Sequence, residues 1–431
     1  MPFHQYDPAL ANSRLDISQF NYYGDVCRLQ FWLDAYRRLF NRAIWLTETS
    51  CCWNASSNPN GFRKKGWCTA NTLMSFASGG EMCLYWLFRS HKGGHEMGHG
   101  SVIDAWGRDL PSSNEVRAIS KTLDKLAPMV QGTKPRQSEI AISFHHLPYV
   151  MDRHCSFETM GHRVDYIADI RDRIYLPIMR EKFRPDVLFS ASADLTPYKL
   201  LITHRHLTLE EGDFLEKILP WVENGGTWVV GPYTDMFTAD LAKYRNAPFG
   251  HLEDWAKIER TYYVPSPNGS MPGASNVELP TVTMADGSEA KVVANLCFDA
   301  ITPKEGVKVL AKYKDGYEYL DGFAAITETK VGKGRIILMG VQLDTADYRR
   351  FIRQITDECG IEPLTTGGSD TVQVNVLEGD YGTVFTAIEC GGAAGSIVIP
   401  FDCTNIDTGE KYTKGQTLPM SGYQCVFAKK D

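Results

Sequence analysis

The fold of this chain is decided by a short run that reads Ile44-Trp45-Leu46-Thr47-Glu48-Thr49-Ser50. Its three leading apolar residues match a short buried strand, and the polar residues that follow mark where that strand ends. Just before it, apolar residues recur at helical spacing between Asp25 and Arg42. An amphipathic helix that leads into a buried strand is the repeating unit of α/β folds. We therefore expect Glu48 to lie at the carboxyl end of a parallel strand.

The same alternation continues to about residue 130. Thr69 is placed to begin a helix that Gly79-Gly80 would end, because Thr favours the N-cap and Gly the position after the last turn. Met82–Phe88 is the next apolar run and predicts a strand. Ser112 and Glu115 then have capping-box spacing ahead of a helical stripe. This order of elements predicts parallel pairing of the strands.

Two further units follow a linker that reads Gly132-Thr133-Lys134-Pro135. Residues 136–363 alternate again, include a long helix over 162–183, and predict a three-layer sheet of flavodoxin or glutamine-amidotransferase type. A catalytic amidotransferase needs a cysteine on a G-x-C-x-G elbow. The sequence has none, so we expect this sheet to be non-catalytic. Residues 369–431 contain strand patterns separated by Gly and Asp-Thr-Gly turns, which predict a small antiparallel β-sandwich.

Composition and charge exclude several classes of function. The 431 residues carry a net charge of −7, which argues against a nucleic-acid or an anionic-membrane partner. No apolar run approaches the roughly 20 residues of a membrane span, and the N-terminus has no secretory signal. The eleven cysteines include no C-x-x-C pair, so we expect most of them to be buried or idle thiols in a reducing, cytoplasmic compartment, without structural zinc. We also expect no cofactor.

A second stretch, His95-Glu96-Met97-Gly98-His99, matches the H-E-x-x-H pattern of zinc peptidases. That pattern binds zinc on a helix, where two His at i and i+4 share one face. Glycines occupy positions 93, 94, 98 and 100, and each costs a helix about 1 kcal/mol. We therefore expect a loop on which Glu96 and His99 hydrogen-bond a polar ligand such as a sugar. A zinc metallopeptidase is the weaker alternative.

Several motifs, taken in order along the chain, resemble the family 42 β-galactosidases. They are Trp45–Ser50, Trp53-Asn54, Gly79-Gly80, Tyr85–Arg89 and Gly94–Gly100. The stretch Tyr198–Gly231 resembles the second domain of that family, and the final strands resemble its small third domain. The resemblance implies the C-terminal part of a (β/α)8 barrel over residues 1–131, a flavodoxin-like, trimerisation-type domain over 136–363 and a β-sandwich over 369–431.

The resemblance also assigns roles to individual residues. It implies retaining hydrolysis of β-D-galactosides through a covalent galactosyl-enzyme, with Glu48 as the nucleophile. Glu96 and His99 match residues that hydrogen-bond the galactose hydroxyls, and Trp86 takes the place of an aromatic that packs beside the sugar. Trp53 is the counterpart of a tryptophan that follows the nucleophile, although its spacing differs here. For either tryptophan the other reading is packing in the core.

One essential group of the family has no counterpart. Retaining hydrolysis needs two carboxyl groups about 5–5.5 Å apart, and in the family the acid/base follows an Asn at the end of the fourth barrel strand. The only Asn-Glu pair here, Asn114-Glu115, opens a helix after the nucleophile. About 130 residues cannot build a barrel of roughly 250, so about five strand–helix units are missing. We expect the face around Leu84, Trp86 and Phe88 to be poorly covered.

Two hypotheses from different classes therefore stand beside the zinc alternative. In the first, the chain is a β-galactosidase that is inactive alone and works with an N-terminal barrel fragment. In the second, it is a non-catalytic sugar-binding or assembly subunit. Both include a homo-oligomer, expected to be a trimer, and a β-galactoside as the ligand.

Overall fold

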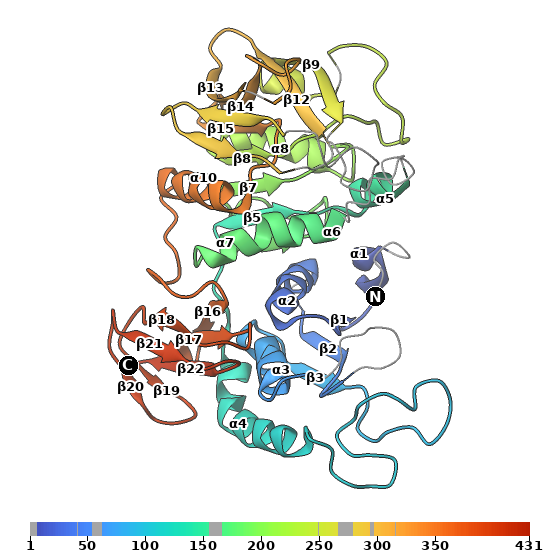
Figure 1. Cartoon of the computed structure of the whole chain (residues 1–431), viewed down its shortest axis with the longest axis vertical. Coiled ribbons are helices and arrows are strands. Elements are labelled where there is room, and N and C mark those ends of the chain that lie inside the picture. The colour runs from blue at the N-terminus through green and yellow to red at the C-terminus, as the bar shows by residue number, and fades with distance from the viewer. Residues whose placement is uncertain are drawn as a thin grey trace.

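The computed structural model describes residues 7–40, 42–53, 63–154, 166–248, 250–265, 279–293, 297–314 and 316–431, with the side chains of 153 and 154 left out. Figure 1 shows three units: the central unit at the top, the N-terminal unit below it on the right, and the C-terminal unit below it on the left.

The N-terminal unit contains a parallel sheet in the order β1-β2-β3, as the sequence predicts. Its elements are α1 (Pro8–Asn12), β1 (Ser18–Asn21), α2 (Val26–Phe40), β2 (Ile44–Thr49), α3 (Trp67–Ala77), β3 (Met82–Tyr85) and α4 (Ser113–Gly132). Both outer strands, β1 and β3, have one neighbour each in this three-stranded sheet of the described residues. The strand predicted over Met82–Phe88 is shorter than expected, because β3 ends at Tyr85.

Two predicted helix starts are wrong in detail. Thr69 lies inside α3 rather than before it, and Ser112 makes no side-chain hydrogen bond as the N-cap of α4. The carboxylate of Glu115 instead accepts hydrogen bonds from the backbone N of Gly66 at 3.3 Å and of Thr69 at 2.7 Å, and from Thr69 Oγ1 at 2.9 Å. Glu115 thus satisfies free N–H groups at the start of another helix, which a pattern of neighbouring residues cannot reveal.

The central unit is built on a parallel core with the strand order β6-β5-β7-β8-β15. In chain order this is 2-1-3-4-5, the arrangement of flavodoxin-like sheets. Its first elements are β5 (Ile140–Ser143), α5 (His146–His154), α6 (Tyr166–Asp169), η2 (Ile170–Tyr175), α7 (Leu176–Arg180), β6 (Asp186–Leu188), β7 (Leu200–Thr203), α8 (Phe214–Glu223) and β8 (Thr227–Val230). The predicted helix over 162–183 is observed as α6, η2 and α7, and residues 162–165 lie outside the described part.

The sheet then continues in a way that the sequence did not predict. Further elements are α9 (Leu252–Trp255), β9 (Ile258–Pro265), β10 (Thr281–Met284), β11 (Glu289–Lys291), β12 (Cys297–Pro303), β13 (Lys308–Lys314), β14 (Ala324–Val331), β15 (Gly334–Met339) and α10 (Thr345–Glu358). Strands β9 to β14 pair antiparallel and extend the parallel core to eleven strands.

The C-terminal unit consists of antiparallel strands, as predicted. They are β16 (Val372–Gly379), β17 (Gly382–Glu389), β18 (Gly395–Val398), β19 (Cys403–Asn405), β20 (Lys411–Tyr412), β21 (Thr417–Met420) and β22 (Cys425–Lys430). The prediction of a linker at residues 132–135 is wrong in part. Lys134–Pro135 forms the short strand β4, which pairs with β16 at the sheet edge.

A disulfide joins Cys27 in α2 to Cys390 just after β17. The prediction of thiols is wrong for this pair, which lies 363 residues apart in sequence and leaves no local spacing signal. The cysteine pattern therefore no longer supports a reducing compartment, because disulfides persist in oxidising ones. Among the described residues, no helix has the length and apolar character needed to cross a bilayer.

Candidate functional site

The candidate site lies at the carboxyl ends of the three strands of the N-terminal unit. Asn21, the last residue of β1, is in register with Glu48 near the end of β2. Trp86 follows β3 directly, and its backbone N donates to the carbonyl O of Thr49 at 2.7 Å. Parallel pairing therefore brings Asn21, Glu48 and Trp86 to one edge of the sheet, which is where barrel enzymes place their catalytic side chains.

Both carboxylate oxygens of Glu48 accept hydrogen bonds. Asn21 Nδ2 donates to Oε2 at 2.7 Å, and the Tyr23 hydroxyl donates to Oε1 in a short contact. The Asn21 amide is oriented in turn, because Thr47 Oγ1 donates to its Oδ1 at 2.9 Å. Glu48 is only partly buried. The carboxylate is thus held in one orientation at a sheet edge that a ligand can reach.

The Tyr23 hydroxyl is kept in its protonated form by its surroundings. Burial raises the pKa of the Tyr23 hydroxyl well above its usual range, and its hydrogen bond to Glu48 and the negative charges of Glu48 and Glu96 raise that pKa further. Tyr23 therefore stays protonated and remains a donor to Glu48.

The segment with the zinc-peptidase pattern is a turn and not a helix, so the loop prediction is confirmed. His95 is exposed, whereas His99 is only 4% exposed. The two rings therefore lack the common helical face that the metal pattern requires, and the zinc-peptidase alternative is abandoned. The described part of the chain contains no cluster of three or more His, Cys, Asp or Glu side chains that could hold a metal ion.

The loop is attached to the strand ends through both tryptophans. Trp86 Nε1 donates to Glu96 Oε2 at 3.1 Å, and the His91 ring packs edge-on against Trp86. Trp53 Nε1 donates to the carbonyl O of Gly98 at 3.0 Å. The backbone N of His99 donates to the carbonyl O of Glu96 at 3.0 Å. Both tryptophans are partly exposed, so neither is simply a core residue.

The structure thus brings together the five residues expected at the site, which are Glu48, Trp53, Trp86, Glu96 and His99. It adds Asn21, Tyr23 and His91, which sequence reasoning missed. Asn21 could have been found, since a polar residue at the end of a predicted strand is a usable signal. Tyr23 and His91 lie on irregular segments, where no periodicity identifies the direction of a side chain.

A fixed carboxylate at a strand end, with a second carboxylate and two tryptophans around it, is an arrangement typical of glycoside hydrolases. Comparison with known proteins specifies the family. Residues 2–126 match a family model described as "Beta-galactosidase", and residues 156–362 match one described as "Beta-galactosidase trimerisation domain". The chain belongs to family 42 of the β-galactosidases, of which it represents the C-terminal part.

Individual relatives agree with this assignment. β-Galactosidase YesZ of Bacillus licheniformis is 25% identical over 96% of this chain and 60% of its own length. YesZ of Bacillus subtilis is 25% identical over 87% of this chain and 54% of its own length. The chain therefore spans a little over half the length of these relatives.

Solved structures show the same fold. The family 42 β-galactosidase Gan42B has a TM-score of 0.88 at 19% identity and covers 100% of this chain and 62% of its own. The β-galactosidase from Bacillus circulans sp. alkalophilus has a TM-score of 0.86 at 16% identity, covering 99% of this chain and 62% of its own. The fold is thus the mixed α/β fold of these enzymes, which is built on a TIM barrel and carries a trimerisation domain.

Proposed function

We propose that this chain supplies the nucleophile-bearing part of a retaining β-galactosidase. The observation that carries the proposal is the position of Glu48 at the end of β2, with Asn21 and Tyr23 bonded to its two oxygens. In a retaining mechanism such a carboxylate attacks the anomeric carbon and forms a covalent glycosyl-enzyme, which water then hydrolyses. The two donors orient Glu48 for this attack.

Glu96, His99, Trp86 and Trp53 form the sugar-binding side of the site. A carboxylate and an imidazole supply acceptors and donors for galactose hydroxyls. The indole of Trp86 holds Glu96 in place through its 3.1 Å hydrogen bond, and its ring offers an apolar surface to a sugar. Glu96 therefore acts here in recognition, with Glu48 as the reacting carboxylate.

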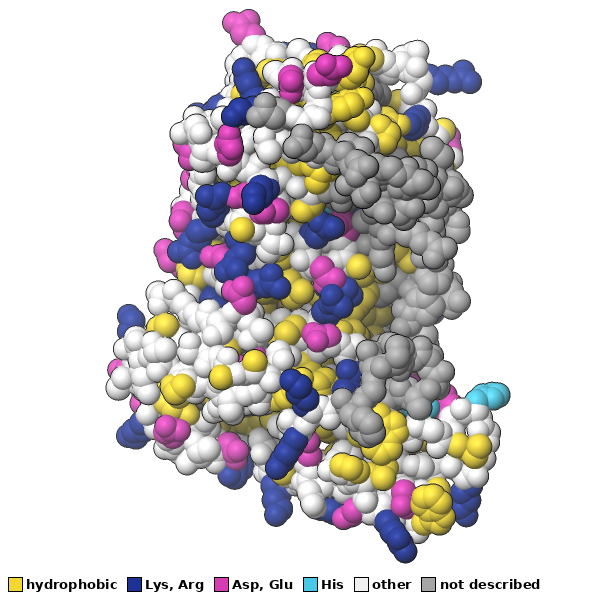
Figure 2. All heavy atoms as spheres, viewed as in Figure 1, with side chains coloured by type: hydrophobic (Ala, Val, Ile, Leu, Met, Phe, Trp, Pro, Cys, Tyr) yellow, Lys and Arg dark blue, Asp and Glu magenta, His cyan; other side chains and the backbone are white. Residues whose placement is uncertain are grey.

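The acid/base carboxyl group comes from about five barrel units outside these 431 residues, on a longer polypeptide or on a separate one. The carboxylate of Glu115, from the Asn-Glu pair, is occupied by the start of α3. Within the described part of the chain, the outer strands β1 and β3 have one neighbour each, and this observation and the exposed apolar side chains around β3 support the same proposal. Leu84 is 45% exposed and Phe88 68% exposed, as the sequence predicts, and Figure 2 shows hydrophobic side chains at the surface in this lower right region.

The test is complementation. The purified chain is mixed with a fragment that carries the preceding barrel units of a family relative, and 4-nitrophenyl β-D-galactoside is the substrate. We expect turnover only in the mixture, abolished by Glu48→Gln and retained by the control Glu115→Gln, which keeps an acceptor oxygen. Turnover that survives Glu48→Gln would refute the assignment of the nucleophile.

The second candidate function is a non-catalytic sugar-binding or assembly subunit, which the match of residues 156–362 to a trimerisation domain supports. In either case we propose a homotrimer formed through the central unit. Absence of turnover in the mixture, with both pieces folded and with galactose still quenching tryptophan fluorescence, would favour the binding function. Sedimentation of the purified chain measures the number of subunits.

A further inference from the structure

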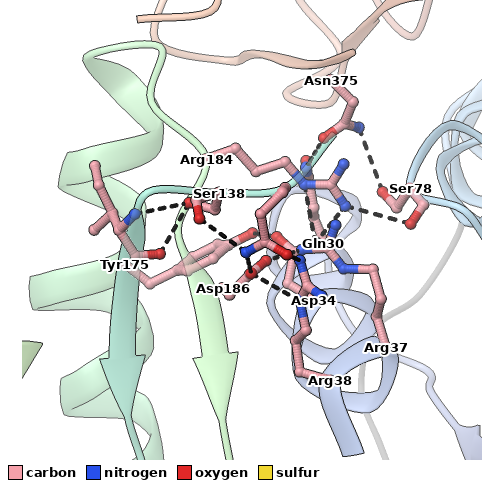
Figure 3. A network of polar contacts seen from close by, with 12 residues as sticks. Gln30, Asp34, Arg37, Arg38, Ser78, Ser138, Tyr175, Arg184, Asp186 and Asn375 are labelled. Carbon is pink, nitrogen blue, oxygen red and sulfur yellow. Dashed lines mark hydrogen bonds and ion pairs between the residues drawn. The ribbon is translucent and has the colours of Figure 1, made fainter. Parts of the chain in front are cut away.

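One face of α2 connects the N-terminal unit to the other two units. The residues on this face are Cys27, Gln30, Asp34, Arg37 and Arg38, in which Arg37 and Arg38 lie three and four positions after Asp34. Figure 3 shows this face between the central unit and the strand that carries Asn375. Gln30 Nε2 donates to Asn375 Oδ1 at 2.5 Å. The helix that leads into the strand of Glu48 is therefore held from outside its own sheet.

The second half of α2 is held by buried ion pairs. Asp34 is fully buried and accepts from Arg184 Nε at 3.0 Å and from the Tyr175 hydroxyl at 2.6 Å. Arg37 contacts Asp186, which is also fully buried. Removing one partner of such a pair costs about 3–5 kcal/mol, because a charge is left buried and uncompensated. Detaching this end of α2 therefore carries a large energetic cost.

The first turn of α2 is held differently. Cys27 is bonded covalently to Cys390, and its carbonyl O accepts from Gln373 Nε2 at 2.6 Å. Both partners belong to the C-terminal unit. Cys27 is partly exposed whereas Cys390 is only 2% exposed, so a small thiol is expected to attack the Cys27 sulfur and release the Cys390 thiolate. The two ends of α2 thus differ, since one attachment is reversible under mild chemistry and the other is not.

The first turn of α2 follows the site segment directly. Only three residues separate Cys27 from Tyr23. The backbone N of Tyr22 donates to the carbonyl O of Glu48 at 2.9 Å, and the Tyr22 hydroxyl donates to the carbonyl O of Asp25 at 2.9 Å. The backbone N of Cys27 donates to Asp25 Oδ1 at 2.8 Å. Residues 21–27 therefore form a short hydrogen-bonded connection from the nucleophile to the disulfide.

We propose that the Cys27–Cys390 disulfide is a positioning element of the galactoside site, which fixes the first turn of α2 and thereby the Tyr23 hydroxyl on Glu48. The proposal rests on the proposed function. Reduction by a dithiol releases this attachment: one reductant thiolate attacks a protein sulfur and forms a mixed disulfide. Its second thiol then closes a cyclic disulfide, so both electrons reside on two protein thiols, each of which takes up a proton.

The experiment compares the oxidised chain with the same chain after treatment with dithiothreitol, and thiol titration must show two additional thiols. Amide hydrogen exchange is the readout that does not depend on turnover. We expect exchange over residues 21–29 to rise at least about tenfold, with residues 31–40 unchanged. No change after complete reduction, or an equal rise along all of α2, would overturn the proposal.

Activity in the complemented enzyme supplies the second readout. We expect reduction to lower kcat by about 5- to 20-fold with little change in KM, because Tyr23 orients the nucleophile rather than the sugar. Cys27→Ser and Cys390→Ser should reproduce the reduced state and no longer respond to dithiothreitol. Cys359→Ser, at a free and partly buried cysteine, is the matched control and should respond like the parent chain. If the oxidised mixture shows no turnover, the proposed function fails, while hydrogen exchange still decides the role of the disulfide.

Discussion

Polar residues follow the carboxyl ends of the strands in two parallel sheets of this chain, one in the N-terminal unit and one in the central unit. The two sheet edges differ in the exposure of these residues and in their partners. In the N-terminal unit, Glu48, Trp86 and Glu96 are partly exposed at the edge. In the central unit, the edge beyond β5 and β7 carries His145 and His204-Arg205-His206, all at most 1% exposed. Ligands of α/β proteins bind at such carboxyl edges, yet only the first of these is open.

The closed edge is filled by its own counter-charges. Asp169 accepts from His204 Nε2 at 2.6 Å and pairs with Arg173 at 2.8 Å and with Arg205 at 3.2 Å. Arg205 also contacts Asp152. Burial by itself would raise the pKa of Asp169, but these positive neighbours hold it well below its ordinary value. The charges of this edge are therefore committed to stability and are unavailable to a ligand.

The comparison shows that a position at the carboxyl edge of a sheet is not enough to make a polar side chain functional. The side chain must also be exposed and must keep free hydrogen-bonding capacity for a ligand. The sequence suggested as much for the central unit, since it lacks the cysteine elbow of an amidotransferase.

Glu48→Gln should lower turnover of the complemented enzyme by roughly 10,000-fold, because loss of a nucleophile removes the covalent path. Its free energy of unfolding in urea should change by less than about 1 kcal/mol, since the side chain is partly exposed and Gln retains an acceptor for Tyr23. A variant with normal turnover, or one that unfolds, would place Glu48 among the structural charges of the other edge.

Asp169→Asn tests the closed edge and should have the opposite profile. We expect it to destabilise the chain by about 3–5 kcal/mol, because His204, Arg173 and Arg205 lose a buried negative partner. Activity per folded molecule should not change. The control is Asp109→Asn, which removes a fully exposed pair with Arg117 and should leave the urea midpoint where it was. A midpoint for Asp169→Asn equal to that of the control would show that this edge is not a stabilising cluster.

Local periodicity explains what the sequence could predict. The helical spacing found between Asp25 and Arg42 corresponds to α2, Val26–Phe40. The strand of Glu48 was recognisable because three apolar residues precede it. Such signals lie within one element, so they are retained in the sequence whatever the tertiary structure.

Pairing between distant residues explains what was missed. Strands β9 to β14 lie in a turn-rich stretch and depend on antiparallel partners for their stability. The disulfide, the pairing of β4 with β16 and the bond from Glu115 to α3 also join residues far apart in sequence. At the site, the strand residue Glu48 could be predicted, whereas Tyr23 acquires its role only when an irregular segment turns back onto β2.

Acid should weaken the closed edge of the central unit. Burial lowers the pKa of His206 to about 3, against an ordinary value near 6.5. A depressed pKa means that the unfolded chain binds the proton more tightly, so stability is complete above pH 6.5 and declines as the pH falls toward 3. We expect His206 to account for a loss of about 3 kcal/mol between pH 6.5 and pH 4.

His206→Leu should remove this part of the pH dependence in urea unfolding, because Leu does not titrate. The substitution should cost little at pH 7, since neither ring nitrogen of the buried His206 has a hydrogen-bond partner among the residues that the structure describes. His95→Leu, at an exposed position in the site loop, is the control and should leave the pH profile unchanged. Parallel profiles for His206→Leu and the parent chain would show that another group carries the acid sensitivity.

Phe88→Ser should have the smallest effect on stability and should report on the unpaired side of the open edge. Phe88 is 68% exposed beside β3, so its loss should change the free energy of unfolding by less than about 0.5 kcal/mol. It should nevertheless reduce binding of a hydrophobic dye and weaken association with the barrel fragment, because a large apolar contact disappears. Tyr319→Ser, 63% exposed on the central unit, is the matched control and should alter neither. Equal dye binding in the two variants would mean that the exposed apolar surface of the N-terminal unit is not the place where further barrel strands attach.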